Sequence, residues 1–132
     1  MKKDIQNRGD IELLVNSFYE KVKADSIIGY IFNDIAHVNW ADHLPRMYDF
    51  WEHILFQTNS YAGNPMRVHE ALNKRVALQP AHFTRWKELF LETVNDLFEG
   101  DMAELARQRA LSIATVMQIK MHPPSTPNQS LL

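Results

Sequence analysis

Residues 10–23 decide the fold class, and they read DIELLVNSFYEKVK. Within this stretch apolar side chains recur at helical spacing, at positions Ile11, Leu14, Val15, Phe18, Tyr19 and Val22. The i, i+3, i+4, i+7 pattern predicts an amphipathic α-helix with one face in a core. Asp10 is the predicted N-cap, and the helix is expected to continue to about Lys23.

A second stretch with the same period runs from Trp40 to Ile54 and contains Pro45. Because proline donates no backbone hydrogen bond, regular helix is expected to begin only near Asp42, after a looser turn.

Two more helices are predicted in the second half of the chain. Pro80 opens a stretch with helical period that is expected to end with Gly100 as its C-cap. Asp101 is the predicted cap of a last helix that reaches Met117.

The segments that connect the helices are predicted from their polar residues, Gly and Pro. Residues 27–32 predict a short inward helical turn before a loop at Asn33 and Asp34. Residues 57–65 predict a loop, residues 66–72 about two helical turns, and residues 73–79 a connection. No segment alternates with a period of two residues, so the predicted fold class is all-α.

Composition bounds the possible functions. The chain has 132 residues, no cysteine and a net charge of −2, which predicts one compact domain, residues 1–122, without disulfides or thiolate chemistry. The proline-rich end, residues 123–132, is expected to be a disordered tail. Near-balanced charge argues against nucleic acid or an anionic membrane as partner. No signal segment and no membrane-spanning stretch is expected, which predicts a cytoplasmic location.

Two histidines are candidates for chemistry. His43 falls on the inward stripe one turn before Met47, where a histidine is either a hydrogen-bonded core residue or a functional one. His69 lies on a segment too short to be held by apolar burial, and a bond from its imidazole to a metal would hold it. The zinc-protease pattern HExxH is absent, because position 73 is Asn. The other histidines, interpreted as solvated or capping residues, are His37, His53, His82 and His122.

Two inward histidines on different helices, with Phe, Trp and Met side chains between them, suit a flat apolar macrocycle with a central iron. Tyr19 and Trp86 would add hydrogen-bond donors on inward faces, and a buried donor normally needs a partner. A diatomic ligand on the iron is one such partner. The alternative is that both are ordinary core aromatics whose donors bind backbone carbonyls, and that the aromatic stripes form only the core of a four-helix protein.

Several segments resemble the truncated haemoglobins, and most closely group III of that family. The matching segments, from about Phe18 to Ala114, are FYEKV at 18–22, GYIFN at 29–33, Trp40 with His43, FW at 50–51, NP at 64–65 leading to His69, and HFTRW at 82–86 with LF at 89–90. Their order and spacing carry the resemblance. The four glycines include no adjacent pair, whereas other groups of the family carry paired glycines.

The resemblance implies a truncated globin-like two-over-two helical sandwich around haem b, iron protoporphyrin IX. His69 matches the proximal histidine that binds the iron and is the implied metal ligand. The positions that face the bound gas match Tyr19, His43 and Trp86, where His43 either gates the pocket or binds the iron itself. The other positions implied at the cofactor are Phe32 on the haem face, Met47, Phe50 and Trp51 in the distal wall, and Arg46 and Arg67 as candidates for the haem propionates.

The implied function is reversible binding of oxygen and other diatomic gases, such as nitric oxide and carbon monoxide, at the sixth coordination position of the iron, for oxygen transport or sensing. A first alternative is a haem enzyme, either a nitric oxide dioxygenase or a peroxidase-like protein, which would need a partner reductase because the chain has no room for a flavin or nicotinamide domain. A second alternative is a helical interaction module without a cofactor. The colour of the purified protein separates this last possibility from the others.

Overall fold

The computed structural model describes residues 2–65, 69, 71–73 and 77–121. The elements in these ranges are the α-helices α1 (Arg8–Ala24), α2 (Trp40–Phe56), α4 (Pro80–Leu97) and α5 (Asp101–Met121), and a π-helix η1 (Ile31–Ile35). The same ranges contain no strand, so the predicted all-α class is confirmed. The predicted tail, residues 123–132, and His122 lie outside the described residues.

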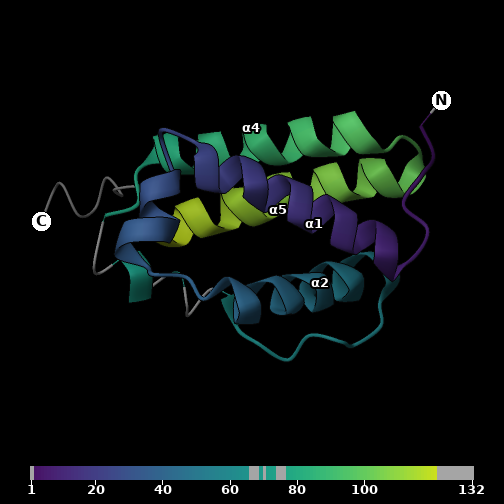
Figure 1. Ribbon diagram of the computed structural model, residues 1–132, viewed down its shortest axis with the longest axis horizontal. Helices are drawn as coiled ribbons and strands as arrows, with labels where there is room; N and C mark the ends of the chain where they lie inside the picture. Colours follow the sequence, from purple (N-terminus) through teal and green to yellow (C-terminus); the bar gives the residue numbers. More distant parts are fainter. Residues whose placement is uncertain (1, 66–68, 70, 74–76, 122–132) are drawn as a thin grey trace, which may run out of the picture.

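The helices form two packed pairs. Helix α1 packs on α2 and on α4, α4 packs on α5, and α5 contacts α2, which makes a two-over-two arrangement (Figure 1). At the left of Figure 1 lie the end of α1, the start of α2, the start of α4 and the end of α5, while their opposite ends lie at the right. None of the described helices has the length and apolar character needed to cross a membrane.

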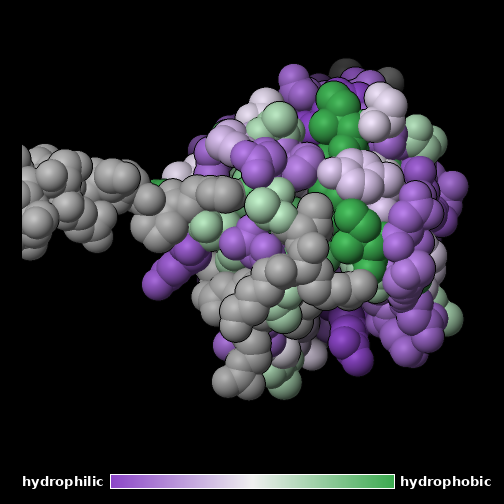
Figure 2. Space-filling view, turned by 90° about the vertical axis from the view of Figure 1, so that its left-hand side faces the viewer, coloured by the Kyte–Doolittle hydropathy of each residue, from purple (hydrophilic) through white to green (hydrophobic). Residues whose placement is uncertain are grey.

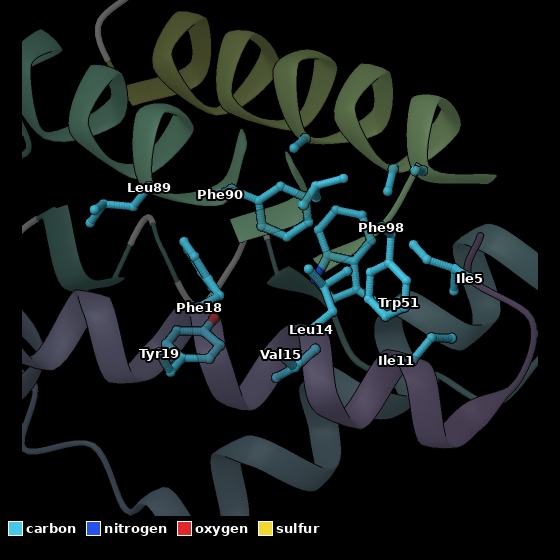
Figure 3. Close-up of a cluster of buried hydrophobic side chains, with 14 of the residues drawn as sticks. Ile5, Ile11, Leu14, Val15, Phe18, Tyr19, Trp51, Leu89, Phe90 and Phe98 are labelled. Atoms are coloured by element: carbon cyan, nitrogen blue, oxygen red, sulfur yellow. The ribbon is translucent and has the colours of Figure 1, made fainter. Parts of the chain in front are cut away.

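A cluster of buried side chains forms the core (Figure 3). We call part of it the packed end and define it by Ile5, Ile11, Leu14, Trp51, Phe90 and Phe98. Trp51 stacks on Phe90 with ring centroids 4.6 Å apart, and Phe18 meets Phe90 edge-on at 5.2 Å. Full burial of a side chain of this kind contributes about 1.5–3 kcal/mol. The packed end therefore supplies much of the stability of the fold.

Helix α1 begins earlier than the sequence pattern predicts. Asn7, not Asp10, is the N-cap, and its side chain accepts a hydrogen bond from the backbone N–H of Asp10. Asp10 lies buried in the first turn, where its carboxylate binds Lys3 at 2.8 Å and the backbone N–H of Gln6. The prediction was wrong because a short polar side chain three residues upstream captures the first free N–H groups.

Helix α2 also begins earlier, at Trp40 rather than near Asp42. Asn39 caps it by accepting a hydrogen bond from Ala41, and the N–H groups of Asp42 and His43 bond to the Asn39 carbonyl. Pro45 therefore lies inside the helix. With the first turn already closed by Asn39, the single backbone donor missing at Pro45 does not prevent the helix from starting upstream.

The start of α5 is capped from the opposite end of the chain. The Asp4 carboxylate accepts hydrogen bonds from the N–H groups of Met102 at 2.9 Å and Ala103 at 2.8 Å. Gly100 has φ +134, and a Cβ there would lie 2.5 Å from Cγ of Asp4. The predicted roles of Gly100 and Asp101 are thus wrong: Phe98 is the C-cap of α4, Asp101 is the first helical residue of α5, and Gly100 makes room for Asp4.

Between α1 and α2 the chain forms a π-helix instead of the predicted loop at Asn33 and Asp34. The Ala36 N–H bonds to the Ile31 carbonyl at 2.7 Å, an i to i+5 bond. Upstream, the Asp25 carboxylate accepts the N–H groups of Ile27 and Ile28 and so closes the inward turn. π-Helices are rare and often lie at functional sites, and this one forms part of the wall described next.

Candidate functional site

A cavity of about 720 Å³ lies among η1, the start of α2, the start of α4 and the end of α5. Its volume falls within the range of about 300–1,000 Å³ typical of small-molecule and cofactor sites. Figure 2 views this end of the molecule, where apolar surface lies between hydrophilic side chains. We call it the cavity end and define it by Tyr19, Phe32, His43, His69 and Trp86.

The residues predicted for the site converge on this cavity. Those that line it are Tyr19, Phe32, His43, Arg46, Met47, Phe50, Trp51, His69 and Trp86. Arg67, the remaining predicted residue, lies outside the described residues. The predicted residues come from α1, η1, α2, α4 and the segment after residue 64, so five separate parts of the chain must pack before they meet.

His69 is held in one orientation by its own backbone. Its Nδ1 lies 2.6 Å from the Pro65 carbonyl oxygen, and because a carbonyl only accepts, Nδ1 carries the proton. Burial lowers the pKa of His69, and the bond to Pro65 opposes this shift only in part. The imidazole is therefore neutral, with an unprotonated Nε2. A ring nitrogen in this state, fixed by a backbone carbonyl behind it, is the form of histidine that binds metals.

His43 approaches the cavity from α2 and is not satisfied by the protein. Its ring meets Tyr19 edge-on with centroids 5.1 Å apart and Trp40 at 5.6 Å. Its Nε2 is buried and has no hydrogen-bond partner in the described part of the chain. Burial, with the neighbouring His69 and the positive charge of Arg46 as further causes, lowers the pKa of His43 to about 4. The interpretation of His43 as a hydrogen-bonded core residue is therefore wrong.

Tyr19 and Trp86 bring two further donors to the same cavity. Tyr19 is only 6% exposed, and within the ranges described neither its hydroxyl nor the Trp86 indole N–H has a hydrogen-bond partner. Burial raises the pKa of Tyr19, so its hydroxyl keeps the proton and can donate. The backbone carbonyl partners of the alternative interpretation are not found among the described residues. Donors left open around a cavity are available to a ligand that accepts hydrogen bonds.

Comparison with known proteins identifies the family. The chain is 31% identical over 121 residues to the group 3 truncated haemoglobin of Campylobacter jejuni, a match that covers 89% of this chain and 93% of that relative. The chain belongs to the group 3 truncated haemoglobins. The crystal structure of the group III truncated haemoglobin from Campylobacter jejuni superposes with a TM-score of 0.82 at 29% identity, covering 96% of this chain and 99% of that one. No family model matches the sequence.

Several cavity residues of this truncated haemoglobin carry no recognisable sequence signal. Tyr61 lies in the loop before His69, where there is no period to read, and its ring packs edge-on against Phe50 at 5.2 Å. Ile113 and Met117 of α5 also line the cavity. Their helical period predicted only core positions, because a sequence period cannot distinguish contact with protein from contact with a ligand.

The remaining histidines behave differently from one another. His82 caps α4, since its Nδ1 accepts the Gln79 N–H at 2.9 Å, which agrees with the capping interpretation. His37 is exposed at the cavity rim and has φ 48. His53 is half-buried, and its Nδ1 has no hydrogen-bond partner among the described residues.

Proposed function

We propose that this truncated haemoglobin binds one haem b in the cavity, with His69 as the protein ligand of the iron, and reversibly binds oxygen and other diatomic gases on the opposite side. The observation that carries the proposal is the hydrogen bond from His69 Nδ1 to the Pro65 carbonyl. It leaves the lone pair of Nε2 free within a cavity of cofactor size.

The donor set fits this cofactor. Apolar side chains dominate the lining, as a porphyrin face requires, and the aromatic wall includes Phe32, which lies 6.1 Å from Trp40 in a stacked arrangement. The buried Nε2 of His43 is an orphaned polar atom in the same cavity. Leaving such a group unpaired costs about 1–3 kcal/mol, a cost that a bound ligand removes.

When bound, haem supplies an iron atom with an open coordination position for a diatomic gas. The other roles in the cavity fall to this chain's own side chains. Tyr19 holds a proton at its hydroxyl, Trp86 holds one at its indole nitrogen, and both are donors fixed on helices. A hydrogen bond to a partly charged acceptor contributes about 1.5–3 kcal/mol, so these donors would slow the loss of a polarised ligand such as oxygen.

Arg46 is the proposed partner of a haem propionate. Its side chain is exposed at the cavity rim, and it forms no ion pair with any carboxylate in the described part of the chain. An unpaired guanidinium can bind a carboxylate with two parallel hydrogen bonds. Arg67 stays a prediction for the same role.

The same open donors favour a second candidate, a nitric oxide dioxygenase or peroxidase-like enzyme. Fixed donors that stabilise a polarised ligand also stabilise charge that develops during a reaction. A partner reductase would then deliver the electrons. Sustained turnover of nitric oxide or peroxide with an added reductant would favour this candidate over simple gas binding.

Reversible oxygenation tests the first proposal directly. The ferrous protein is equilibrated with oxygen and then flushed with argon, and the absorption spectrum should return to the ferrous form over several cycles. In stopped-flow oxygen release, Tyr19→Phe and Trp86→Phe should release oxygen roughly ten- to a hundredfold faster than the wild type. Unchanged release in both variants would contradict the donor roles, and immediate irreversible oxidation would contradict reversible binding.

A further inference from the structure

A buried ion pair joins two of the elements that form the cavity. The Asp25 carboxylate, whose side chain is only 5% exposed, accepts a hydrogen bond from Arg85 Nε at 2.7 Å. Asp25 is the C-cap residue of α1, and Arg85 lies in the second turn of α4. The pair therefore ties together two helix ends that lie on the same side of the fold (Figure 1). Neither of its side chains lines the cavity.

The two carboxylate oxygens of Asp25 have separate partners. Oδ1 accepts the hydrogen bond from Arg85, whereas Oδ2 accepts the backbone N–H groups of Ile27 at 3.0 Å and Ile28 at 3.1 Å. Burial raises the pKa of this carboxyl, but these hydrogen bonds outweigh it and hold the pKa below its usual range. Ile28 is buried and lines the cavity, and the chain continues from it into η1, which contains Phe32. One charged side chain thus links the end of α1, the turn before η1 and the start of α4.

Arg85 directly precedes Trp86, one of the two proposed donors. The Trp86 ring packs edge-on against Phe18 of α1 with ring centroids 5.6 Å apart, and Phe18 lies 4.8 Å from the Tyr19 ring. Phe18 is therefore an apolar spacer between the two donors. Because apolar contacts have no fixed direction, whereas a hydrogen bond joins one donor to one acceptor, the bond from Arg85 to Asp25 fixes how far α4 is shifted along α1.

A second ion pair joins α1 to α4, but it lies at the surface. Lys21 Nζ is 2.8 Å from Asp96 and 3.8 Å from Glu92, and these two acidic side chains are 59% and 58% exposed. Exposed pairs of this kind contribute little, because water screens the charges and long side chains lose entropy when they pair. Loss of one partner from a buried pair leaves a buried charge uncompensated. We therefore expect the placement of α4 to depend on Arg85 and not on Lys21.

We propose that Asp25 and Arg85 are positioning residues that set how long a gas stays bound, because the pair holds the Trp86 indole N–H in one position relative to the Tyr19 hydroxyl. The inference rests on the proposed function, since Trp86 acts on a ligand in the cavity. Asp25 and Arg85 do not reach the cavity themselves. Any effect of theirs on gas binding must therefore pass through the residues that they hold in place.

Stopped-flow oxygen release from the full chain loaded with haem tests the proposal. Arg85→Gln should release oxygen roughly three- to tenfold faster than the wild type, because a displaced donor forms a weaker hydrogen bond. Arg85→Lys keeps a charged donor and should restore part of the difference. Lys21→Gln is the matched control, since it breaks the exposed pair between the same helices, and it should match the wild type. Equal release rates in Arg85→Gln and the wild type would overturn the proposal.

A double-mutant cycle separates positioning from a general loss of structure. In a Trp86→Phe background, which lacks the indole donor, the addition of Arg85→Gln should not accelerate oxygen release further, because the group through which Arg85 acts is already gone. A purely structural effect of Arg85 would instead add to that of Trp86. Full additivity of the two substitutions would therefore overturn the proposal.

Nuclear magnetic resonance of the apoprotein gives a readout that needs no haem. Asp25→Asn loses one acceptor, because an amide offers one oxygen where the carboxylate offers two. The Overhauser cross-peak between the Phe18 and Trp86 rings should weaken, and the Trp86 indole N–H should exchange faster with solvent. Both signals should keep their wild-type values in Lys21→Gln. Arg85→Gln, which leaves the hydrogen bonds to Asp25 Oδ2 intact, takes the place of Asp25→Asn if that variant does not fold.

The two experiments fail in distinguishable ways. Ring and indole signals that do not change in the variants of the pair overturn the positioning role. A wild-type protein that binds no haem overturns the proposed function instead, and the apoprotein experiment then decides the role of the pair alone.

Discussion

The two ends of the molecule treat polar groups in opposite ways. At the packed end, the buried polar residues Asp10 and Thr93 have partners: Thr93 Oγ1 donates to the Leu89 carbonyl at 2.7 Å, and Asp10 binds both Lys3 and Gln6. At the cavity end, His43 Nε2 and the Tyr19 hydroxyl have none in the described part of the chain. One end is built for stability, whereas the other keeps polar atoms open for a ligand.

The largest expected effect on the apoprotein comes from the packed end. Phe90 is fully buried and stacks with both Trp51 and Trp86. Phe90→Ala should lower the free energy of unfolding by about 3–5 kcal/mol, through lost burial and the cavity left behind. Urea unfolding of the apoprotein measures it. A loss below that of an exposed control such as Leu111→Ala would show that the packed end does not dominate stability.

The opposite sign is expected at the cavity end. His43→Leu replaces a histidine whose buried Nε2 is unpaired, so the apoprotein should gain about 1–3 kcal/mol of unfolding free energy. The same urea titration at pH 7 measures the change. If the variant is less stable than the wild type, His43 is a structural residue and the contrast between the two ends fails.

The pH dependence sharpens this comparison. The pKa of His43 falls from an ordinary value of 6.5 to about 4 on folding, so between these values the unfolded chain binds more protons than the native one. Above pH 6.5 His43 is neutral in both states and its titration does not affect stability, whereas the unfolding free energy falls as the pH drops from 6.5 towards 4. In His43→Leu the slope of unfolding free energy against pH should be smaller, by at most about 1.4 kcal/mol per pH unit. Equal slopes in both proteins would contradict the depressed pKa.

A smaller effect is expected where the N-terminal segment contacts the start of α5. Asp4→Ala removes the carboxylate that caps Met102 and Ala103 and should cost about 0.5–2 kcal/mol of unfolding free energy. Burial raises the pKa of Asp4, but hydrogen bonds from backbone N–H groups outweigh it and hold the pKa below its usual range. The cap therefore stabilises above pH 3.8 and is lost as the pH falls further. Haem affinity serves as the control, and it should not change.

Much of the arrangement could be predicted from the sequence because it depends on period. The stripe from Ile11 to Val22 specifies a helical face, and faces of this kind leave few ways to pack four helices. The site residues could be proposed because the order of FYEKV, His43 and HFTRW resembles one family. Neither signal needs contacts between residues far apart in sequence.

What the sequence could not reveal depends on such contacts. Asp4 caps a helix that begins 97 positions later in the chain, and no local pattern announces a cap at that distance. Tyr61 reaches the cavity from an irregular loop, and the bond from His69 to Pro65 becomes visible only when the backbone path is known. The predicted starts of α1 and α2 were wrong for a local reason. The true caps, Asn7 and Asn39, lie only a few residues before the predicted starts, and the sequence pattern does not distinguish between such close candidates.

Titration of the purified apoprotein with hemin tests the central claim most directly. The wild type should bind one equivalent, and the ferrous protein should give the absorption and resonance Raman signature of iron with one histidine ligand. His69→Ala should lose that signature, whereas His82→Ala, whose imidazole serves as a helix cap, should keep it. A wild type that binds no stoichiometric hemin, or a His69→Ala variant with an unchanged ferrous spectrum, would contradict the assignment of His69 and its cavity as the haem site.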